Sequence, residues 1–171
     1  MHVEAAESRI LILKEKMKLK QYTIYAIGTV LGSGFAPFAP GTAGSIVAVL
    51  LYYLLITSHL SLLVLTVVFF FIGVAVSFHL EKNEGKDAQI IVVDELVGQW
   101  IAFLFLPKTL PILITGFILF RLFDIFKPYP INALQKLKGG WGVMSDDVLA
   151  GIYANILIQI IIITGIIQWI R

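Results

Sequence analysis

Residues 90–100 read IIVVDELVGQW, and the rest of the chain is organised around this stretch. Asp94 and Glu95 stand side by side after four β-branched residues, and mostly apolar residues follow them. A charged carboxylate in an apolar medium costs several kcal/mol unless a partner compensates it. The pair therefore predicts a functional site, whose other members must come from elsewhere in the chain.

The composition predicts an integral membrane protein. Of the 171 residues, 58% are hydrophobic and 14% are charged, and the mean hydropathy is +0.91. A soluble domain has about 25% charged residues. No Asp, Glu, Lys or Arg occurs from Gln21 to Leu80, a length sufficient for more than one membrane segment. The chain has no cysteine, which excludes disulfides and thiolate metal sites.

The chain divides into a basic amphipathic leader, residues 1–21, and a single helical membrane domain, residues 22–171. Five of the 13 basic residues precede the first apolar region. Residues 5–20 read as a helix with Ile10, Leu13 and Met17 on one side, which fits either an anchor on anionic lipid or a solvated leader. No apolar core with a cleavage site is present, so we expect no cleaved signal peptide.

Five apolar segments are predicted as helices or helix pieces: residues 43–57, 60–80, 90–106, 110–126 and 146–170. Before them, residues 32–45 read GSGFAPFAPGTAGS, whose glycines and prolines argue against continuous helix. Such backbone is tolerated at membrane depth only when it is buried in protein or faces a watery cavity. The expected fold is all-α, a compact multi-helix membrane bundle with a Gly/Pro-rich re-entrant loop near the N-terminus.

The distribution of charge predicts the orientation. If residues 1–20 are cytoplasmic and each apolar segment crosses once, residues 81–89 and 127–145 are cytoplasmic as well. The outer side then keeps only Lys108 and Arg171, in agreement with the positive-inside rule. If each segment crosses the membrane once, one cytoplasmic layer contains both acidic pairs, the basic residues near 121–127 and the glycine loop.

Two acidic pairs share a pattern, DELVG at 94–98 and DDVLAG at 146–151. A small residue four positions after an acid lies on the same helix face and lets another backbone approach. The alternative is helix capping, because acids favour helix N-termini. Carboxylates with few compensating bases predict a divalent cation, and ligands that are all oxygen suit Mg²⁺. The expected metal-site residues are Asp94, Glu95, Asp124, Asp146 and Asp147.

A stripe of charge lies in FRLFDIFKPYPI, residues 120–131. Arg121, Asp124 and Lys127 are three residues apart and share one face of a helix that ends before Pro128. They form either a self-neutralising row of salt bridges or a metal ligand between two phosphate-binding cations.

The sequence APGTAGS, residues 39–45, leads into the first apolar helix. Glycines such as Gly41 and Gly44 let backbone amides point at an anion, and a helix N-terminus favours it electrostatically. Thr42 and Ser45 can cap the helix or donate to a phosphate oxygen. The alternative is a broken segment that only turns the chain, and no Gly-Lys-Ser/Thr follows as in a P-loop.

The motifs GSGFAPFAPGTAGS, VVDELVG, FRLFDIFKPYPI and GGWGVMSDDVLAG are similar, in order and spacing, to the bacterial phosphatidylglycerophosphatase A family. The resemblance implies a Mg²⁺-dependent lipid phosphatase that hydrolyses phosphatidylglycerophosphate to phosphatidylglycerol and phosphate. It further implies a phospholipid substrate and a cytoplasmic-facing active site in the bacterial inner membrane. No nucleic-acid or protein partner is implied.

In this interpretation, carboxylates hold Mg²⁺, which polarises the phosphate and orients water. Arg121 and Lys127 stabilise phosphoryl charge, together with amides around Thr42 and Ser45. One carboxylate acts as nucleophile or as general base. The catalytic candidates are Asp94, Glu95, Asp124 and Asp147.

Two other functions fit parts of the pattern. An ion-coupled transporter would use the acids as a relay, but they collect at one face instead of forming a path. A membrane phosphotransferase acting on lipid head groups is a closer alternative. Its signature places an Asp-Gly and further aspartates in one extended motif, whereas here the acids are spread over three helices.

Overall fold

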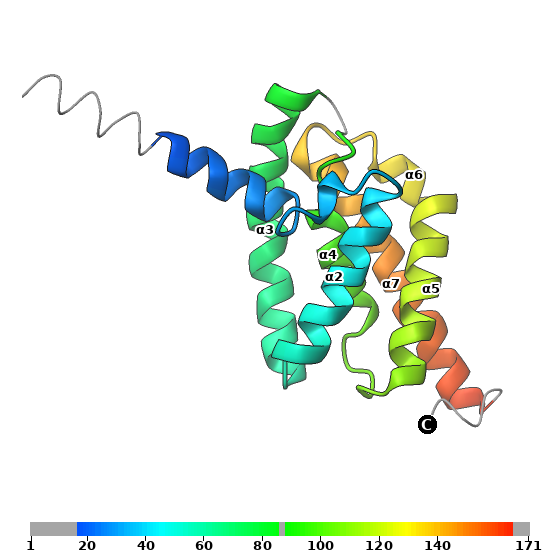
Figure 1. The fold of residues 1–171 in the computed structure, drawn as a ribbon. Coiled ribbons are helices and arrows are strands. Elements are labelled where there is room, and N and C mark those ends of the chain that lie inside the picture. The colour runs from blue at the N-terminus through cyan, green and yellow to red at the C-terminus, as the bar shows by residue number, and fades with distance from the viewer. Residues whose placement is uncertain (1–16, 86–87, 166–171) are drawn as a thin grey trace, which may run out of the picture.

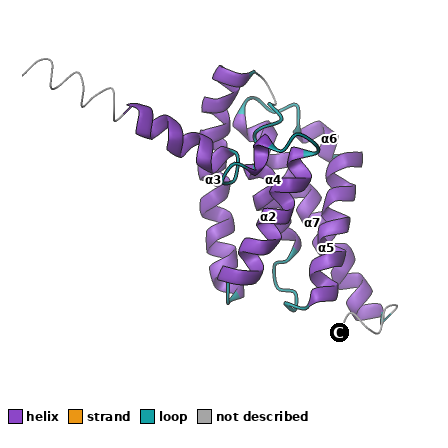
Figure 2. Cartoon of the chain, in the orientation of Figure 1, coloured by secondary structure: helices purple, strands orange, loops and turns teal. Residues whose placement is uncertain are grey.

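The computed structural model describes residues 17–85 and 88–165, and every regular element in these ranges is a helix (Figures 1 and 2). The predicted all-α fold is therefore confirmed. The elements are η1 (Ser33–Phe35), α2 (Pro40–Leu55), α3 (His59–Glu84), α4 (Val93–Ala102), α5 (Leu110–Phe126), α6 (Ile131–Leu134) and α7 (Gly140–Thr164).

A helix over residues 17–28 precedes η1 and extends away from the bundle in Figure 1. It contains the last part of the predicted basic leader. The leader residues Ile10 and Leu13, and the end of the last predicted helix at residues 166–170, lie outside the described residues.

Helix α4 is the centre of the bundle, since it packs against α2, α3, α5 and α7. Its side chains Leu96, Val97 and Trp100 are buried. The Trp100 indole donates a hydrogen bond to the Ala48 carbonyl of α2 at 3.0 Å. The stretch 90–100 is thus surrounded by other helices, which explains why it is apolar on nearly every side.

The prediction of a helix over residues 90–106 is too long at both ends. Helix α4 ends at Ala102, and Phe105 is in the left-handed region with φ 60°. The Asn155 side-chain amide of α7 donates to the carbonyls of Ala102 at 3.2 Å and Leu104 at 2.8 Å. Carbonyls at a helix end need such partners, and α7 supplies them here.

Residues 32–45 are not a continuous helix, as predicted, but α2 begins at Pro40, three residues before the predicted start at residue 43. Proline is favourable at the first position of a helix, where its missing N–H would have no acceptor. Gly44 is then needed for packing, since a Cβ at this position would lie 2.8 Å from the Val92 side chain. The irregular segment before α2 ends at Ala39, with φ 48°.

Helix α7 begins at Gly140, six residues before the predicted start. The GG sequence at 139–140 permits this start: Gly139 has φ 59°, and a Cβ on Gly140 would overlap the Val74 carbonyl of α3. The short helix α6 connects α5 to this turn and was not predicted. The acids at 146–147 therefore lie in the second turn of α7, one turn deeper than the sequence pattern suggests.

Helices α3 and α7 are, among the described elements, the two that are long and apolar enough to cross a membrane. Their 26 and 25 residues correspond to about 38 Å at ~1.5 Å per residue, more than the ~30 Å of a bilayer core. Helix α4, with 10 residues, is too short to span by itself.

Candidate active site

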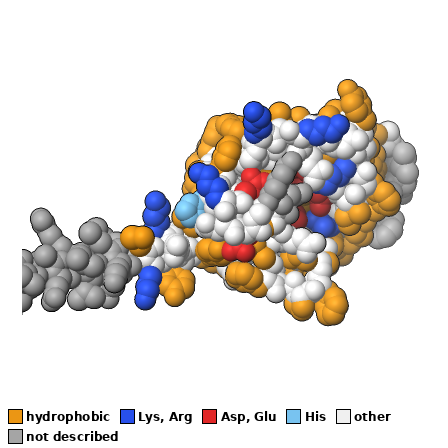
Figure 3. All heavy atoms as spheres, turned by 90° about the horizontal axis from the view of Figure 1, so that it is seen from above, with side chains coloured by type: hydrophobic (Ala, Val, Ile, Leu, Met, Phe, Trp, Pro, Cys, Tyr) orange, Lys and Arg blue, Asp and Glu red, His pale blue; other side chains and the backbone are white. Residues whose placement is uncertain are grey.

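The acidic side chains expected in the site come together at one end of the bundle. Figure 3 looks down on this end, where carboxylates gather in the centre of the face with Lys and Arg side chains around them. They line a pocket of about 530 Å³ between the ends of α2, α4, α5 and α7. The lining residues among the predicted set are Gly41, Asp94, Glu95, Arg121, Asp124, Lys127, Asp146 and Asp147.

Asp94 and Glu95 lie in the first turn of α4. The positive end of a helix dipole favours negative charge there, which offsets part of the cost of burial. Neither side chain caps the helix by a hydrogen bond, so capping does not explain the pair. The Asp94 Oδ1 and Glu95 Oε2 atoms are buried and have no hydrogen-bond partner among the described residues.

Asp146 and Asp147 are both buried in the second turn of α7. Because α7 starts at Gly140, the capping alternative for these two acids does not apply. Asp147 points to α4: one carboxylate oxygen from each of Asp94, Glu95 and Asp147 lies within 4.8 Å of the others. We call these three residues the carboxylate triad.

The triad depends on a close crossing of α4 and α7. A Cβ on Gly98 would lie 2.7 Å from the Asp147 carbonyl, and a Cβ on Gly151 would overlap the Gly98 carbonyl. The two glycines, each four residues after an acid, therefore allow the helices to approach at the level of the carboxylates. This is the arrangement that the small residues in DELVG and DDVLAG predict.

Replacing Gly151 by valine should separate the two helices and disperse the triad. The added side chain meets the Gly98 backbone and the Ile101 side chain, and overpacking of this kind costs about 1–3 kcal/mol or more. We expect a lower midpoint of thermal unfolding in detergent. A Gly165→Ala variant is the control, because its surroundings are open, although its φ of 64° adds some backbone strain. A Gly151→Val protein as stable as the parent would contradict the close crossing.

Arg121, Asp124 and Lys127 form a row of ion pairs along α5. The Arg121 Nη1 atom lies 2.7 Å from Asp124 Oδ2, and the Lys127 Nζ atom lies 3.3 Å from Asp124 Oδ1. Lys127 also donates to Asp146 Oδ2 at 2.5 Å. Both Asp124 oxygens and one Asp146 oxygen are thereby paired with cations. The salt-bridge alternative thus describes the geometry of the row, which extends across to α7.

Lys127 lies at the C-terminal end of α5 with φ 42°, next to Pro128. Burial alone would lower the pKa of its ammonium group, but the carboxylates of Asp147, Asp146 and Asp124 outweigh this and raise the pKa above its usual value. The side chain therefore remains protonated at physiological pH. A permanent cation is thus held between α5 and α7 at the edge of the pocket.

Arg121 connects three helices. Besides Asp124, its Nη1 atom lies 3.7 Å from Glu95 Oε1 of α4 and donates to Ser45 Oγ of α2 at 3.5 Å. Its Nε atom has no hydrogen-bond partner among the described residues. The guanidinium group therefore retains a donor beside the carboxylate triad.

The predicted phosphate loop is divided by the start of α2. Gly41 lines the pocket, and a Cβ at this position would overlap Glu95 Oε1. Ser45 is buried and donates to the Gly41 carbonyl at 2.9 Å. Thr42 and Gly44 do not line the pocket; Gly44 packs against Val92. The structure thus brings Gly41 and Ser45 to the site region and leaves Thr42 and Gly44 outside the pocket.

Sequence reasoning did not select Gln89 and Gln135, whose side chains also line the pocket. Neutral amides in loop segments have no pattern that distinguishes them from other surface residues, so no sequence signal identifies them. His59 and His79 are not among the residues that line the pocket.

The pocket collects five carboxylates and two cations, so three negative charges are uncompensated when all groups are ionised. The oxygens without hydrogen bonds belong to the carboxylate triad and to Asp146. Buried charge of this kind requires a further positive partner. The geometry therefore fits a bound cation on the side of the triad and an anion on the side of Arg121.

Comparison with known proteins assigns the chain to a family. A family model described as Phosphatidylglycerophosphatase A matches residues 26–162. The chain belongs to the phosphatidylglycerophosphatase A family. The match includes every predicted site residue, and the resemblance inferred from the four motifs is confirmed. No solved structure matches the chain.

Three curated relatives cover most of the chain. A protein of Bacteroides thetaiotaomicron, named "Putative phosphatidylinositol-3-phosphatase", is 44% identical over 84% of this chain and 96% of its own length. The Phosphatidylglycerophosphatase A of Escherichia coli is 33% identical over 82% of this chain and 84% of its own length. That of Haemophilus influenzae is 36% identical over 85% of this chain and 91% of its own.

Membership of the phosphatidylglycerophosphatase A family identifies the chain as a phosphatase, a phosphoric monoester hydrolase. The family is associated with membranes, in agreement with the two candidate spanning helices. The predicted enzyme class is confirmed, and the pocket with its carboxylates and cations is the candidate active site.

Proposed function

We propose that the protein hydrolyses phosphatidylglycerophosphate to phosphatidylglycerol and inorganic phosphate, with Mg²⁺ as cofactor. The family supports the phosphatidylglycerophosphatase activity. The observation that carries the proposal is the pocket itself, in which a carboxylate triad with unpartnered oxygens adjoins Arg121, whose side chain is partly buried.

The carboxylate triad is the proposed metal site. Its donors are all oxygen, which suits Mg²⁺. One carboxylate oxygen from each of the three residues lies within 4.8 Å of the others, so Asp94, Glu95 and Asp147 would hold the ion together. When bound, Mg²⁺ polarises a phosphate oxygen and lowers the pKa of bound water. Asp124 and Asp146, which are paired with cations, support the site by holding Arg121 and Lys127 in place.

Arg121 and Lys127 are the proposed phosphate-binding residues. Each is fixed by carboxylates of at least two helices, so neither needs to reorganise when the phosphate enters. Preorganised donors of this kind contribute most where charge develops in the transition state. The Gly41 amide, in the first turn of α2, adds a donor without an intrahelical acceptor.

A carboxylate of the site has one of two chemical roles. It either removes a proton from the attacking water, or it attacks the phosphorus itself and forms an aspartyl phosphate that water then hydrolyses. In both routes the P–O bond to the glycerol breaks, and the departing glycerol oxygen takes up a proton. Acid quenching of the enzyme during turnover of ³²P-labelled substrate distinguishes them. Label retained on the protein supports a carboxylate that acts as nucleophile, and unlabelled protein supports a carboxylate that acts as general base.

The proposed location is the bacterial inner membrane, which the chain crosses more than once, with the active site on the cytoplasmic face. The pocket lies at the same end of the bundle as the segments around residues 81–85 and 127–139, which carry Lys82, Lys136 and Lys138. The positive-inside rule favours the cytoplasm for such an end. Hydrolysis in sealed right-side-out vesicles with substrate confined to the outer leaflet would contradict this orientation.

A second candidate substrate is phosphatidylinositol 3-phosphate, because the relative with 44% identity carries that activity in its name. Both lipids carry a phosphomonoester on a polyol head group, which a phosphodiester joins to diacylglycerol, so the proposed metal and phosphate contacts serve either. The transporter and phosphotransferase alternatives lack such support, since the family is one of phosphatases.

The decisive experiment measures phosphate release by the purified protein in detergent. The substrates are phosphatidylglycerophosphate, phosphatidylinositol 3-phosphate, phosphatidic acid and glycerol phosphate, each with Mg²⁺ and with EDTA. We expect the highest kcat/KM on phosphatidylglycerophosphate and loss of activity in EDTA that Mg²⁺ restores. Preference for the inositol lipid would reassign the substrate, and full activity in EDTA would refute the proposed dependence on Mg²⁺.

A further inference from the structure

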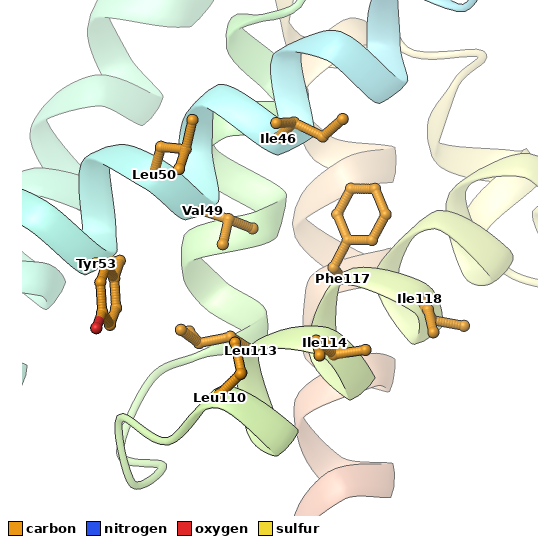
Figure 4. A pocket seen from close by; sticks show the side chains of 9 residues that line it. All are labelled: Ile46, Val49, Leu50, Tyr53, Leu110, Leu113, Ile114, Phe117 and Ile118. Carbon is orange, nitrogen blue, oxygen red and sulfur yellow. The ribbon is translucent and has the colours of Figure 1, made fainter.

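A second cavity, of about 460 Å³, lies on the side of the bundle between α2 and α5 (Figure 4). Its walls are apolar side chains, apart from the Tyr53 hydroxyl at one end. Its lining includes Ile46, Val49 and Leu50 of α2 and Leu113, Ile114 and Phe117 of α5. We call this cavity the lateral groove.

The lateral groove begins about one helical turn from the active site. On α2, Val49 follows Ser45 by one helical turn, and on α5, Phe117 precedes Arg121 by one turn. Residues four apart share a face, so the contact between Arg121 and Ser45 at 3.5 Å lies above the walls of the groove. From Ile46 to Tyr53 the groove extends about 10 Å along α2, at ~1.5 Å per residue.

The groove faces outward. Ile46, Leu50 and Ile114 line it and are each about half exposed, whereas Leu113 is buried and joins it to the core. In a bundle that contains membrane-spanning helices, a side face of this kind meets lipid chains instead of water. An apolar groove that begins beside a phosphate-binding arginine has the shape that a phosphomonoester with an acyl chain requires.

We propose that the lateral groove binds one acyl chain of the lipid substrate while the phosphomonoester occupies the carboxylate-lined pocket. This inference rests on the proposed lipid phosphatase function. Transfer of a chain from the bilayer to the groove brings little hydrophobic free energy, because lipid tails are as apolar as the protein side chains. The groove instead orients the substrate, placing the phosphate next to Arg121, and such positioning accelerates a reaction.

The test fills the groove from each wall with tryptophan. Ile114→Trp and Leu50→Trp should each lower kcat/KM on a long-chain diacyl phosphatidylglycerophosphate by about tenfold or more. The same variants should keep their activity on an analogue with acyl chains too short to occupy the groove. The control is Ile156→Trp on α7, because Ile156 is 50% exposed and Ile114 is 52% exposed, while Ile156 lies outside the groove.

The outcomes separate this inference from the proposed function. Wild-type protein without activity on any lipid phosphomonoester would refute the function. If the wild type is active, two results would overturn the proposal that the groove binds an acyl chain. One is an equal loss of kcat/KM for Ile114→Trp and Ile156→Trp, and the other is an equal loss on long-chain and short-chain substrates. A lower oligomeric mass of Ile114→Trp in detergent would also overturn it, because the groove would then be an interface with a second copy of the chain.

Discussion

Asp94→Asn should reduce phosphate release by roughly 10³-fold or more while the protein remains folded. The substitution keeps the shape of the side chain but removes one charge from the carboxylate triad, whose oxygens lie within 4.8 Å of one another. Because the neighbouring carboxylates repel one another, removing the charge of Asp94 should leave the midpoint of thermal unfolding unchanged or raise it. Steady-state kinetics and a thermal melt in detergent measure the two effects.

Metal binding provides a readout of this variant that does not depend on turnover. A ligand that binds only the folded state raises the unfolding midpoint, so Mg²⁺ should stabilise the wild-type protein and fail to stabilise Asp94→Asn. Glu84→Gln is the control, since Glu84 is exposed at the end of α3 and does not line the pocket. Full activity of Asp94→Asn would remove Asp94 from the site.

Arg121→Lys should lower kcat by about 10²-fold, although the positive charge is retained. The Arg121 Nη1 atom approaches Asp124, Glu95 and Ser45 of three different helices. A lysine ammonium has no second nitrogen like the unpartnered Nε of Arg121, which can donate to a phosphoryl oxygen while Nη1 keeps these contacts. The loss should be in kcat more than in KM, because the contact to the phosphoryl group strengthens in the transition state.

The control for Arg121→Lys is Lys138→Gln, which removes an exposed cation from the same end of the bundle. Arg121→Ala with added guanidinium provides a second measurement, since the free ion can restore the missing donor. We expect partial recovery of kcat for Arg121→Ala and none for Asp94→Asn. An Arg121→Lys enzyme with wild-type kcat would show that charge alone suffices at this position.

Much of the fold follows from local features of the chain. The uncharged run from Gln21 to Leu80 predicted membrane segments, of which α3 is long enough to span a bilayer, and α5 occupies the predicted residues 110–126. Local patterns failed where a neighbouring helix decides the outcome. The Asn155 side-chain amide of α7 donates to the Ala102 and Leu104 carbonyls at the end of α4, and the Val74 backbone of α3 requires a glycine at position 140.

The sequence by itself determined which charged side chains line the candidate site, namely acids in apolar surroundings and a cationic stripe on α5, and it placed a glycine one turn after an acid of each pair. Only the tertiary structure decided how the carboxylates divide, with Asp94, Glu95 and Asp147 converging while Asp124 and Asp146 pair with Arg121 and Lys127. Helical periodicity sets directions within one helix. Distances between carboxylates on different helices depend on how closely those helices cross, and here the packing of Gly98 against Gly151 sets them.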